Sequence, residues 1–118
     1  MQLFYREKGI DTHPPLIILH GLWGASDSWL PVADLLSHRF HVILPDLRNH
    51  GCSPHSSLFD YTILSQDTEE LIGRLNLPQR PFLAGHSLGG KTLMHLVLKR
   101  PEIVEKAAII DILSLIHI

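Results

Sequence analysis

The chain has 118 residues, of which 45% are hydrophobic and 19% charged, as expected for one small globular domain rather than a disordered segment. The formal net charge of −2 argues against nucleic acid as a partner. A single cysteine, Cys52, excludes an internal disulfide, and the scattered histidines show no metal-ligand spacing. Residues 1–11 lack a secretion-signal pattern and no apolar stretch could span a bilayer. We therefore expect a cytoplasmic protein with no membrane partner, no metal and no cofactor.

The first part of the chain predicts two strands and a helix. Residues 3–7 alternate apolar and polar side chains and predict an edge strand. Residues 16–19 form a continuous aliphatic run, typical of a strand buried on both faces of a parallel sheet. Residues 29–37 have an apolar face and predict a helix, which either Asp27 or Ser28 would cap.

The second part continues the alternation of strands and helices. We predict buried strands at 42–44, 81–84 and 107–110, and helices at 61–76 and 92–99. A long loop, residues 47–60, follows the first of these strands, and loops of this length are often functional. Strands and helices that alternate with short connections predict one α/β domain, with an open, mostly parallel sheet flanked by helices.

The most informative stretch is Gly85-His86-Ser87-Leu88-Gly89, which matches the pattern G-x-S-x-G. It lies between a predicted strand and a predicted helix, which is the context in which this pattern presents a serine hydroxyl above the edge of a sheet. Ser87 would then stand at a helix N-terminus, where free N–H groups and the helix dipole favour developing negative charge. The sequence therefore predicts that Ser87 is a catalytic nucleophile.

A serine nucleophile needs donors for the oxyanion and a general base. We expect one donor to be the N–H of Leu88, and the second to be the N–H of Leu22 in the loop after the first buried strand. His20 at the start of that loop should tie it down by hydrogen bonds. The order in this fold is serine, then acid, then histidine, so we expect the base beyond residue 118.

Several other polar residues have candidate roles. Asp111 is the acid at a strand end after Ser87, and the alternatives are a catalytic acid or a simple turn former. Asp46 should hold the loop that follows it through bonds to backbone groups. His20, Trp23 and His50 are expected to line the substrate pocket. Three further histidines are expected at helix ends or at the surface: His38, His41 and His95.

Four segments together resemble the N-terminal half of an α/β-hydrolase, and within that superfamily the YbfF-type bacterial esterases and their mitochondrial relatives. The most specific is the Arg-Asn-His-Gly sequence at 48–51 with Ser-Pro behind it. The resemblance implies serine esterase or thioesterase chemistry on a small-molecule acyl ester, with Ser87 as nucleophile and Asp111 as candidate acid. The segments are His20-Gly21-Leu22-Trp23-Gly24, residues 46–55, residues 85–91 and Ile109-Ile110-Asp111-Ile112.

The sequence thus predicts a serine hydrolase that cleaves carboxylic esters through an acyl-enzyme. Alternatives are a thioesterase or C–C bond hydrolase of the same fold, or a non-catalytic ligand receptor on this scaffold. The resemblance stops after residue 112, so we expect residues 1–112 to be the N-terminal part of one α/β-hydrolase domain, truncated before the catalytic histidine and inactive alone. Residues 113–118 resemble one translated frame of a transposon-end sequencing adapter and are expected to be an artefactual tail.

Overall fold

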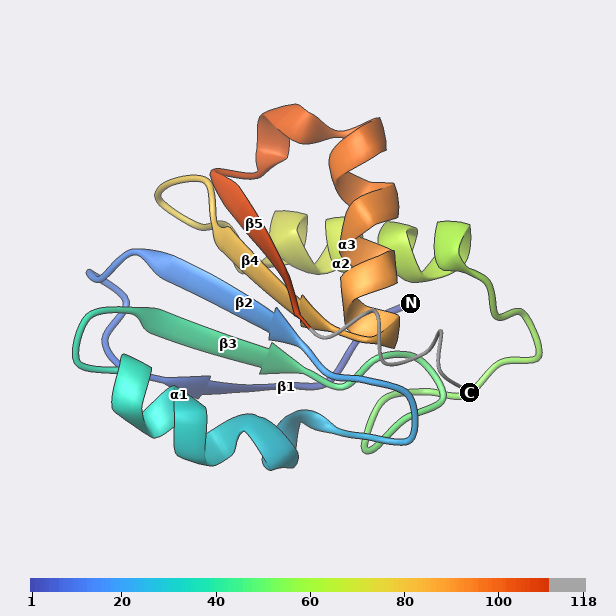
Figure 1. The fold of residues 1–118 in the computed structure, drawn as a ribbon, viewed down its shortest axis with the longest axis horizontal. Coiled ribbons are helices and arrows are strands. Elements are labelled where there is room, and N and C mark those ends of the chain that lie inside the picture. Colours follow the sequence, from blue (N-terminus) through green and yellow to red (C-terminus); the bar gives the residue numbers. More distant parts are fainter. Residues whose placement is uncertain (111–118) are drawn as a thin grey trace.

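A computed structural model describes residues 1–110 of the chain and contains one five-stranded sheet (Figure 1). The strands are β1 (Tyr5–Lys8), β2 (Pro15–Leu19), β3 (His41–Pro45), β4 (Phe82–His86) and β5 (Lys106–Ile110). They lie side by side in the order β1-β3-β2-β4-β5. β1 runs antiparallel to β3, and the other neighbours are parallel. The predicted α/β fold with a mostly parallel sheet is confirmed.

The sheet has a hydrophobic core on each face, because its central strands carry apolar side chains that alternate between the faces. Ile17 packs into the core beneath α2 (Tyr61–Leu75) and α3 (Leu88–Lys99), whereas Ile18 packs into the core beneath α1 (Leu30–Leu36). Figure 1 shows α1 on one side of the sheet and the pair α2 and α3 on the other. No helix within residues 1–110 combines the length and apolar character that crossing a bilayer requires.

The helix predicted at 29–37 is shorter in the structure and has a different start. A 3₁₀ turn, Ser26–Trp29, precedes α1, and Pro31 lies in the first turn of α1, where its missing N–H is not needed. The prediction that Asp27 or Ser28 caps this helix is wrong. Neither side chain makes a cap bond, and the Ser28 hydroxyl instead donates to a carbonyl oxygen three residues earlier, at 2.8 Å.

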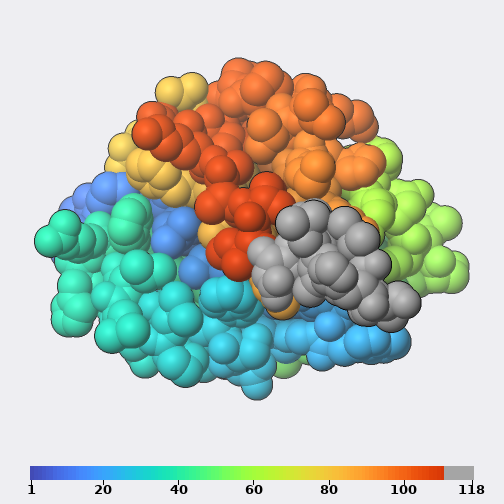
Figure 2. Space-filling view, in the orientation of Figure 1, coloured from blue at the N-terminus to red at the C-terminus, as the bar shows by residue number. Residues whose placement is uncertain are grey.

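The last strand, an apolar run typical of a sheet interior, is an exposed edge in the part of the chain that the structure describes. Every residue of β5 is exposed, because in the part of the chain that the structure describes β5 has a neighbour only on its β4 side. Figure 2 shows β5 (red) open at the surface beside α3 (orange). An apolar groove of about 310 Å³ lies between the two elements, lined by Leu93, Met94, Val97, Leu98, Ala107 and Ile109.

His41 also differs from its predicted surface position, while His38 and His95 are exposed as expected. His41 is buried at the start of β3, and its Nε2 atom lies 3.5 Å from the carboxylate of Glu7. The strand pairing explains the difference, because β3 lies between β1 and β2 and is covered along its whole length.

β2 and β4 form the centre of the sheet, and the direction of strand addition changes between them. The chain passes from β2 to β3 on one side, whereas β4 pairs with the opposite side of β2. In open α/β sheets the carboxyl ends of strands at such a switch point form the ligand-binding crevice. His20 follows β2 and Ser87 follows β4, so both residues stand at this crevice.

Candidate active site

Ser87 forms the whole turn between β4 and α3 and has a backbone conformation that few residues other than glycine adopt. Its φ is 55° and its ψ is −112°, and α3 begins at the next residue. A non-glycine residue in such a region costs about 1–3 kcal/mol, a strain typical of functional sites. The strand, sharp turn and helix that the G-x-S-x-G pattern requires are all present. Ser87 itself is 8% exposed.

Two glycines let α3 approach the sheet closely at this turn. A Cβ atom added to Gly85 would lie 2.5 Å from the carbonyl oxygen of Gly89, and one added to Gly89 would overlap the carbonyl oxygen of Leu19. The N-terminus of α3 is therefore packed directly against the ends of β2 and β4. The first N–H groups of a helix have no carbonyl partner within it, and the dipole there attracts negative charge. The N–H of Leu88 is the first of these groups.

The loop after β2 lies against the Ser87 turn. A Cβ atom added to Gly21 would be 3.3 Å from Cβ of Ser87 and 2.9 Å from Nδ1 of His86. The N–H of Gly24 donates to the carbonyl oxygen of Gly21 at 3.0 Å, which closes a four-residue turn. Leu22 is the second residue of this turn, next in the chain to the residue that approaches Ser87.

His20 supports this loop from its buried side. Its ring is 1% exposed, so it lies behind the loop and not on a pocket surface. Nδ1 is 2.8 Å from the carbonyl oxygen of Gly21, and Nε2 accepts the N–H of Leu47 at 3.0 Å. Burial lowers the pKa of His20 below its ordinary value of 6.5, although the bond to Gly21 favours the charged form. The imidazole is therefore neutral at physiological pH.

Trp23 and His50 are brought together from the neighbouring loops that follow β2 and β3. The N–H of Trp23 donates to Nε2 of His50 at 3.2 Å, and Trp23 has a φ of 65°, as the third residue of a type II turn requires. The Trp23 side chain is 90% exposed at the rim of the crevice, whereas His50 is 7% exposed. The His50 ring lies between those of His20 and Phe59, with centroids 5.0 Å and 6.3 Å away.

Asp46 joins the same two loops through its carboxylate, as predicted for the loop that follows it. It accepts the N–H of Ser26 at 2.6 Å and the N–H of Cys52 at 2.8 Å. Burial alone would raise the pKa of Asp46, but these donors outweigh burial and lower it. The hydroxyl of Ser53 donates to the Asp46 carbonyl oxygen at 2.5 Å. Asp46 thus holds the turn before α1 as well as the long loop.

A buried ion pair between Arg48 and Asp67 was not predicted from the sequence. The Arg48 guanidinium donates to both Asp67 oxygens, at 2.8 and 3.0 Å, and also to the carbonyl oxygen of Leu58 at 2.9 Å. It fixes the long loop to α2. The sequence does contain an indication that Asp67 is buried. It lies three residues after Leu64 and four before Leu71, on the buried face of α2, where a carboxylate needs a charged partner.

His86 lies beside Trp29, with ring centroids 6.1 Å apart. Asp111 lies outside the described residues, as do residues 113–118.

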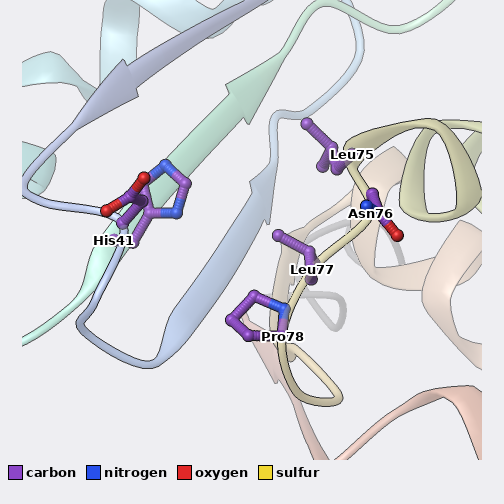
Figure 3. A pocket seen from close by; sticks show the side chains of 6 residues that line it. His41, Leu75, Asn76, Leu77 and Pro78 are labelled. Atoms are coloured by element: carbon purple, nitrogen blue, oxygen red, sulfur yellow. The ribbon is translucent and has the colours of Figure 1, made fainter.

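A pocket of about 370 Å³, lined in part by His41 and Asn76, lies at the end of the sheet opposite Ser87, where the strands begin (Figure 3). Within residues 1–110 no cluster of three or more histidine, cysteine or acidic residues could hold a metal ion.

Comparison with known proteins shows the family to which the fold belongs. The family model described as alpha/beta hydrolase fold matches residues 14–117. The chain belongs to the α/β-hydrolase family. A solved structure titled "Marine microorganism esterase" is 42% identical, with a TM-score of 0.88, and the alignment covers 92% of this α/β-hydrolase chain and 41% of that chain.

Two curated relatives differ in the reactions that their names describe. The mouse protein named sn-1-specific diacylglycerol lipase ABHD11 is 42% identical over 106 residues, covering 88% of this chain and 34% of the relative. Ethanol acetyltransferase 1 of Cyberlindnera fabianii is 36% identical over 109 residues, covering 91% of this chain and 32% of the relative. This α/β-hydrolase chain thus spans about a third of the length of these curated relatives.

Proposed function

We propose that this α/β-hydrolase segment supplies the nucleophile and the oxyanion donors of an enzyme that cleaves small-molecule carboxylic esters. The observation that carries the proposal is the Ser87 turn, with φ of 55° and the loop after β2 packed against it. Strain of this kind persists where surrounding packing enforces it, and here it presents a serine at the N-terminus of a helix. Relatives named as esterase and lipase support ester substrates.

The chemistry assigned to the site has two steps. The Ser87 oxygen attacks the ester carbonyl carbon as its proton passes to a general base, and the oxyanion accepts the N–H groups of Leu22 and Leu88. Collapse breaks the carbon–oxygen bond of the ester, and the leaving alcohol takes the proton from the base. Water then attacks the acyl-enzyme by the same route and releases the acid. We assign the base to a histidine encoded beyond residue 118, and the acid that orients it to Asp111.

The test is covalent labelling of Ser87 in a chain in which this segment is followed by its downstream coding sequence. A serine-reactive fluorophosphonate should label Ser87, and Ser87→Ala should abolish labelling and lower ester hydrolysis about a thousandfold or more. Ser57→Ala is the matched control, because Ser57 is an exposed serine of the long loop. Hydrolysis that persists in Ser87→Ala would refute the assignment. Binding of ester without acylation would favour a receptor.

Acyl transfer to an alcohol is the second candidate, favoured by the relative named as an ethanol acetyltransferase. Both reactions share the acyl-enzyme on Ser87 and differ only in whether water or an alcohol accepts the acyl group. Hydrolysis in the presence of ethanol separates them. A transferase converts most of the acyl-enzyme to the ethyl ester, whereas a hydrolase releases mainly the acid.

A further inference from the structure

Two histidines link the loop after β2 to the loop after β3 by hydrogen bonds that run in opposite directions. His20, in the first loop, accepts the N–H of Leu47 from the second at 3.0 Å. His50, in the second loop, accepts the N–H of Trp23 from the first at 3.2 Å. In both rings the acceptor atom is Nε2. Each loop therefore provides one imidazole and one backbone donor.

The remaining ring nitrogens fix the protonation state of both histidines. Nδ1 of His20 lies 2.8 Å from the carbonyl oxygen of Gly21, and Nδ1 of His50 lies 2.9 Å from that of Arg48. A carbonyl oxygen only accepts, so each Nδ1 carries the hydrogen. Each Nε2 faces an N–H donor and must offer a lone pair. Both rings are thus neutral Nδ1–H tautomers, and a proton on either Nε2 would place two donors against each other.

The bonds of these rings constrain both peptide groups that flank Leu22. The carbonyl of Gly21, which accepts from His20, belongs to the same planar peptide as the N–H of Leu22. In a trans peptide the C=O and N–H point in opposite directions, so fixing the carbonyl aims the N–H. The next peptide carries the N–H of Trp23, which His50 holds. Trp23 is thereby kept at a positive φ that a tryptophan adopts only under constraint.

We propose that His20 and His50 form a histidine pair whose neutral Nδ1–H tautomers position the N–H of Leu22 for the oxyanion. The role at the oxyanion rests on the proposed function, whereas the two tautomers and the two loop contacts do not. His20 and His50 are positioning residues, since neither ring needs to touch substrate. A donor held in place before the reaction stabilises an oxyanion most, because it needs no reorganisation as charge develops.

The first measurement uses the 118-residue chain without substitutions. Long-range ¹H–¹⁵N correlation spectra of the imidazoles at pH 7.5 should give the pattern of a neutral Nδ1–H tautomer for both His20 and His50. Amide exchange should be slow at Leu47 and Trp23. An Nε2–H or charged pattern for either ring would overturn the proposal. The measurement requires neither a substitution nor catalytic activity.

Variants at His50 test the contact with Trp23. The side-chain oxygen of His50→Gln can occupy the position of Nε2 and accept the same N–H, whereas His50→Leu cannot. Exchange at the Trp23 amide should rise about tenfold or more in His50→Leu and stay near its original rate in His50→Gln. His55→Leu is the matched control, because His55 is an exposed histidine of the same loop. Equal exchange in His50→Leu and His55→Leu would contradict the proposal.

The effect of His50 on catalysis is measured in the longer chain used for Ser87 labelling, in which this segment is followed by its downstream coding sequence. His50→Leu should slow acylation of Ser87 by an ester about tenfold or more with little change in KM, and His50→Gln should restore most of the rate. The two proposals fail separately. Correct tautomers with an unlabelled Ser87 would refute the proposed function and keep the histidine pair, whereas wrong tautomers with a labelled Ser87 would do the reverse.

Discussion

The backbone N–H of Ser87 donates a 3.3 Å hydrogen bond to the carbonyl oxygen of Ile110, the last residue of β5. In the β4–β5 register Ile110 pairs with His86, the residue before the candidate nucleophile. The chain therefore leaves β5 directly beside the turn that presents Ser87. The next residue in the sequence is Asp111, which gives that aspartate a physical reason to be considered as the catalytic acid.

Asp111→Asn should reduce kcat of the downstream-extended enzyme about a hundredfold or more while changing its melting temperature little. A catalytic acid holds the histidine in the required tautomer and stabilises its charged form. Asparagine has no negative charge and does neither. Steady-state ester hydrolysis and thermal unfolding check this. Asp34→Asn is the control, because Asp34 is an exposed acid on α1. A kinetic loss no larger than in the control would make Asp111 a turn former and place the acid further along the chain.

Gly89→Ala should disrupt the Ser87 turn. The added Cβ would overlap the Leu19 carbonyl oxygen and lie 2.7 Å from Cβ of Leu19, so α3 must move away from β2. We expect the free energy of unfolding to fall by about 1–3 kcal/mol, as for an overpacked core site. Gly73→Ala is the matched control within α2, since nothing lies within 4 Å of its added Cβ, and it should stabilise by about 0.5–1 kcal/mol. Urea denaturation of both variants measures the difference. Similar values for the two would show that close helix packing does not constrain Gly89.

Arg48→Met should lower the free energy of unfolding by about 3 kcal/mol. It leaves the Asp67 carboxylate, whose side chain is 3% exposed, without its guanidinium partner. The amino group of Met1, 3.6 Å from Asp67, compensates only in part. Adding Asp67→Leu should recover most of the loss, because no buried charge then remains.

The control for this ion pair is Arg100→Met. Arg100 also bonds two acids, Glu69 and Glu102, but its side chain is 45% exposed. Exposed pairs contribute about 0–1 kcal/mol, so Arg100→Met should fall within that range in the same denaturation assay. A loss in Arg48→Met no larger than this would mean that the Arg48–Asp67 contact does not anchor the long loop.

Acidification should weaken the fold below about pH 6.5, because burial lowers the pKa of His20 from its ordinary value of 6.5. In this range the unfolded chain binds a proton at His20 that the folded chain does not. Stability is then fully present above pH 6.5 and is lost as the pH falls toward the folded pKa, by up to about 1.4 kcal/mol per pH unit for one group. The electrostatic effect of His50 also lowers the pKa of His20, whereas the carboxylates of Asp46 and Asp27 raise it.

Denaturant unfolding between pH 7.5 and pH 5 measures this slope. His20→Gln removes the titrating group and should flatten the curve in this window, whereas His38→Gln, at an exposed histidine, should leave it unchanged. The lowered pKa of Asp46 acts in the same direction, but only as the pH falls below the ordinary value of 3.8. A curve for His20→Gln that still falls between pH 6.5 and pH 5 would assign the effect to another group.

Local patterns in the sequence determined the kinds of element and the identity of the candidate nucleophile. The aliphatic runs at 16–19 and 42–44 are strands, and the G-x-S-x-G pattern stands between a strand and a helix. These features depend on residues within a few positions of one another, which is why periodicity and turn chemistry report them. The role of Asp46 was predictable for the same reason, since Cys52 is only six residues away.

Only the tertiary structure decided which loops meet at the crevice and which polar groups are buried there. His20 bonds Leu47 across 27 residues, and Trp23 bonds His50 across the same separation. These contacts exist because β2 and β3 are parallel neighbours, so the loops that follow their carboxyl ends lie side by side. No local pattern encodes such pairings. The exposure of β5 likewise follows from strand order, because within residues 1–110 β5 pairs with β4 alone.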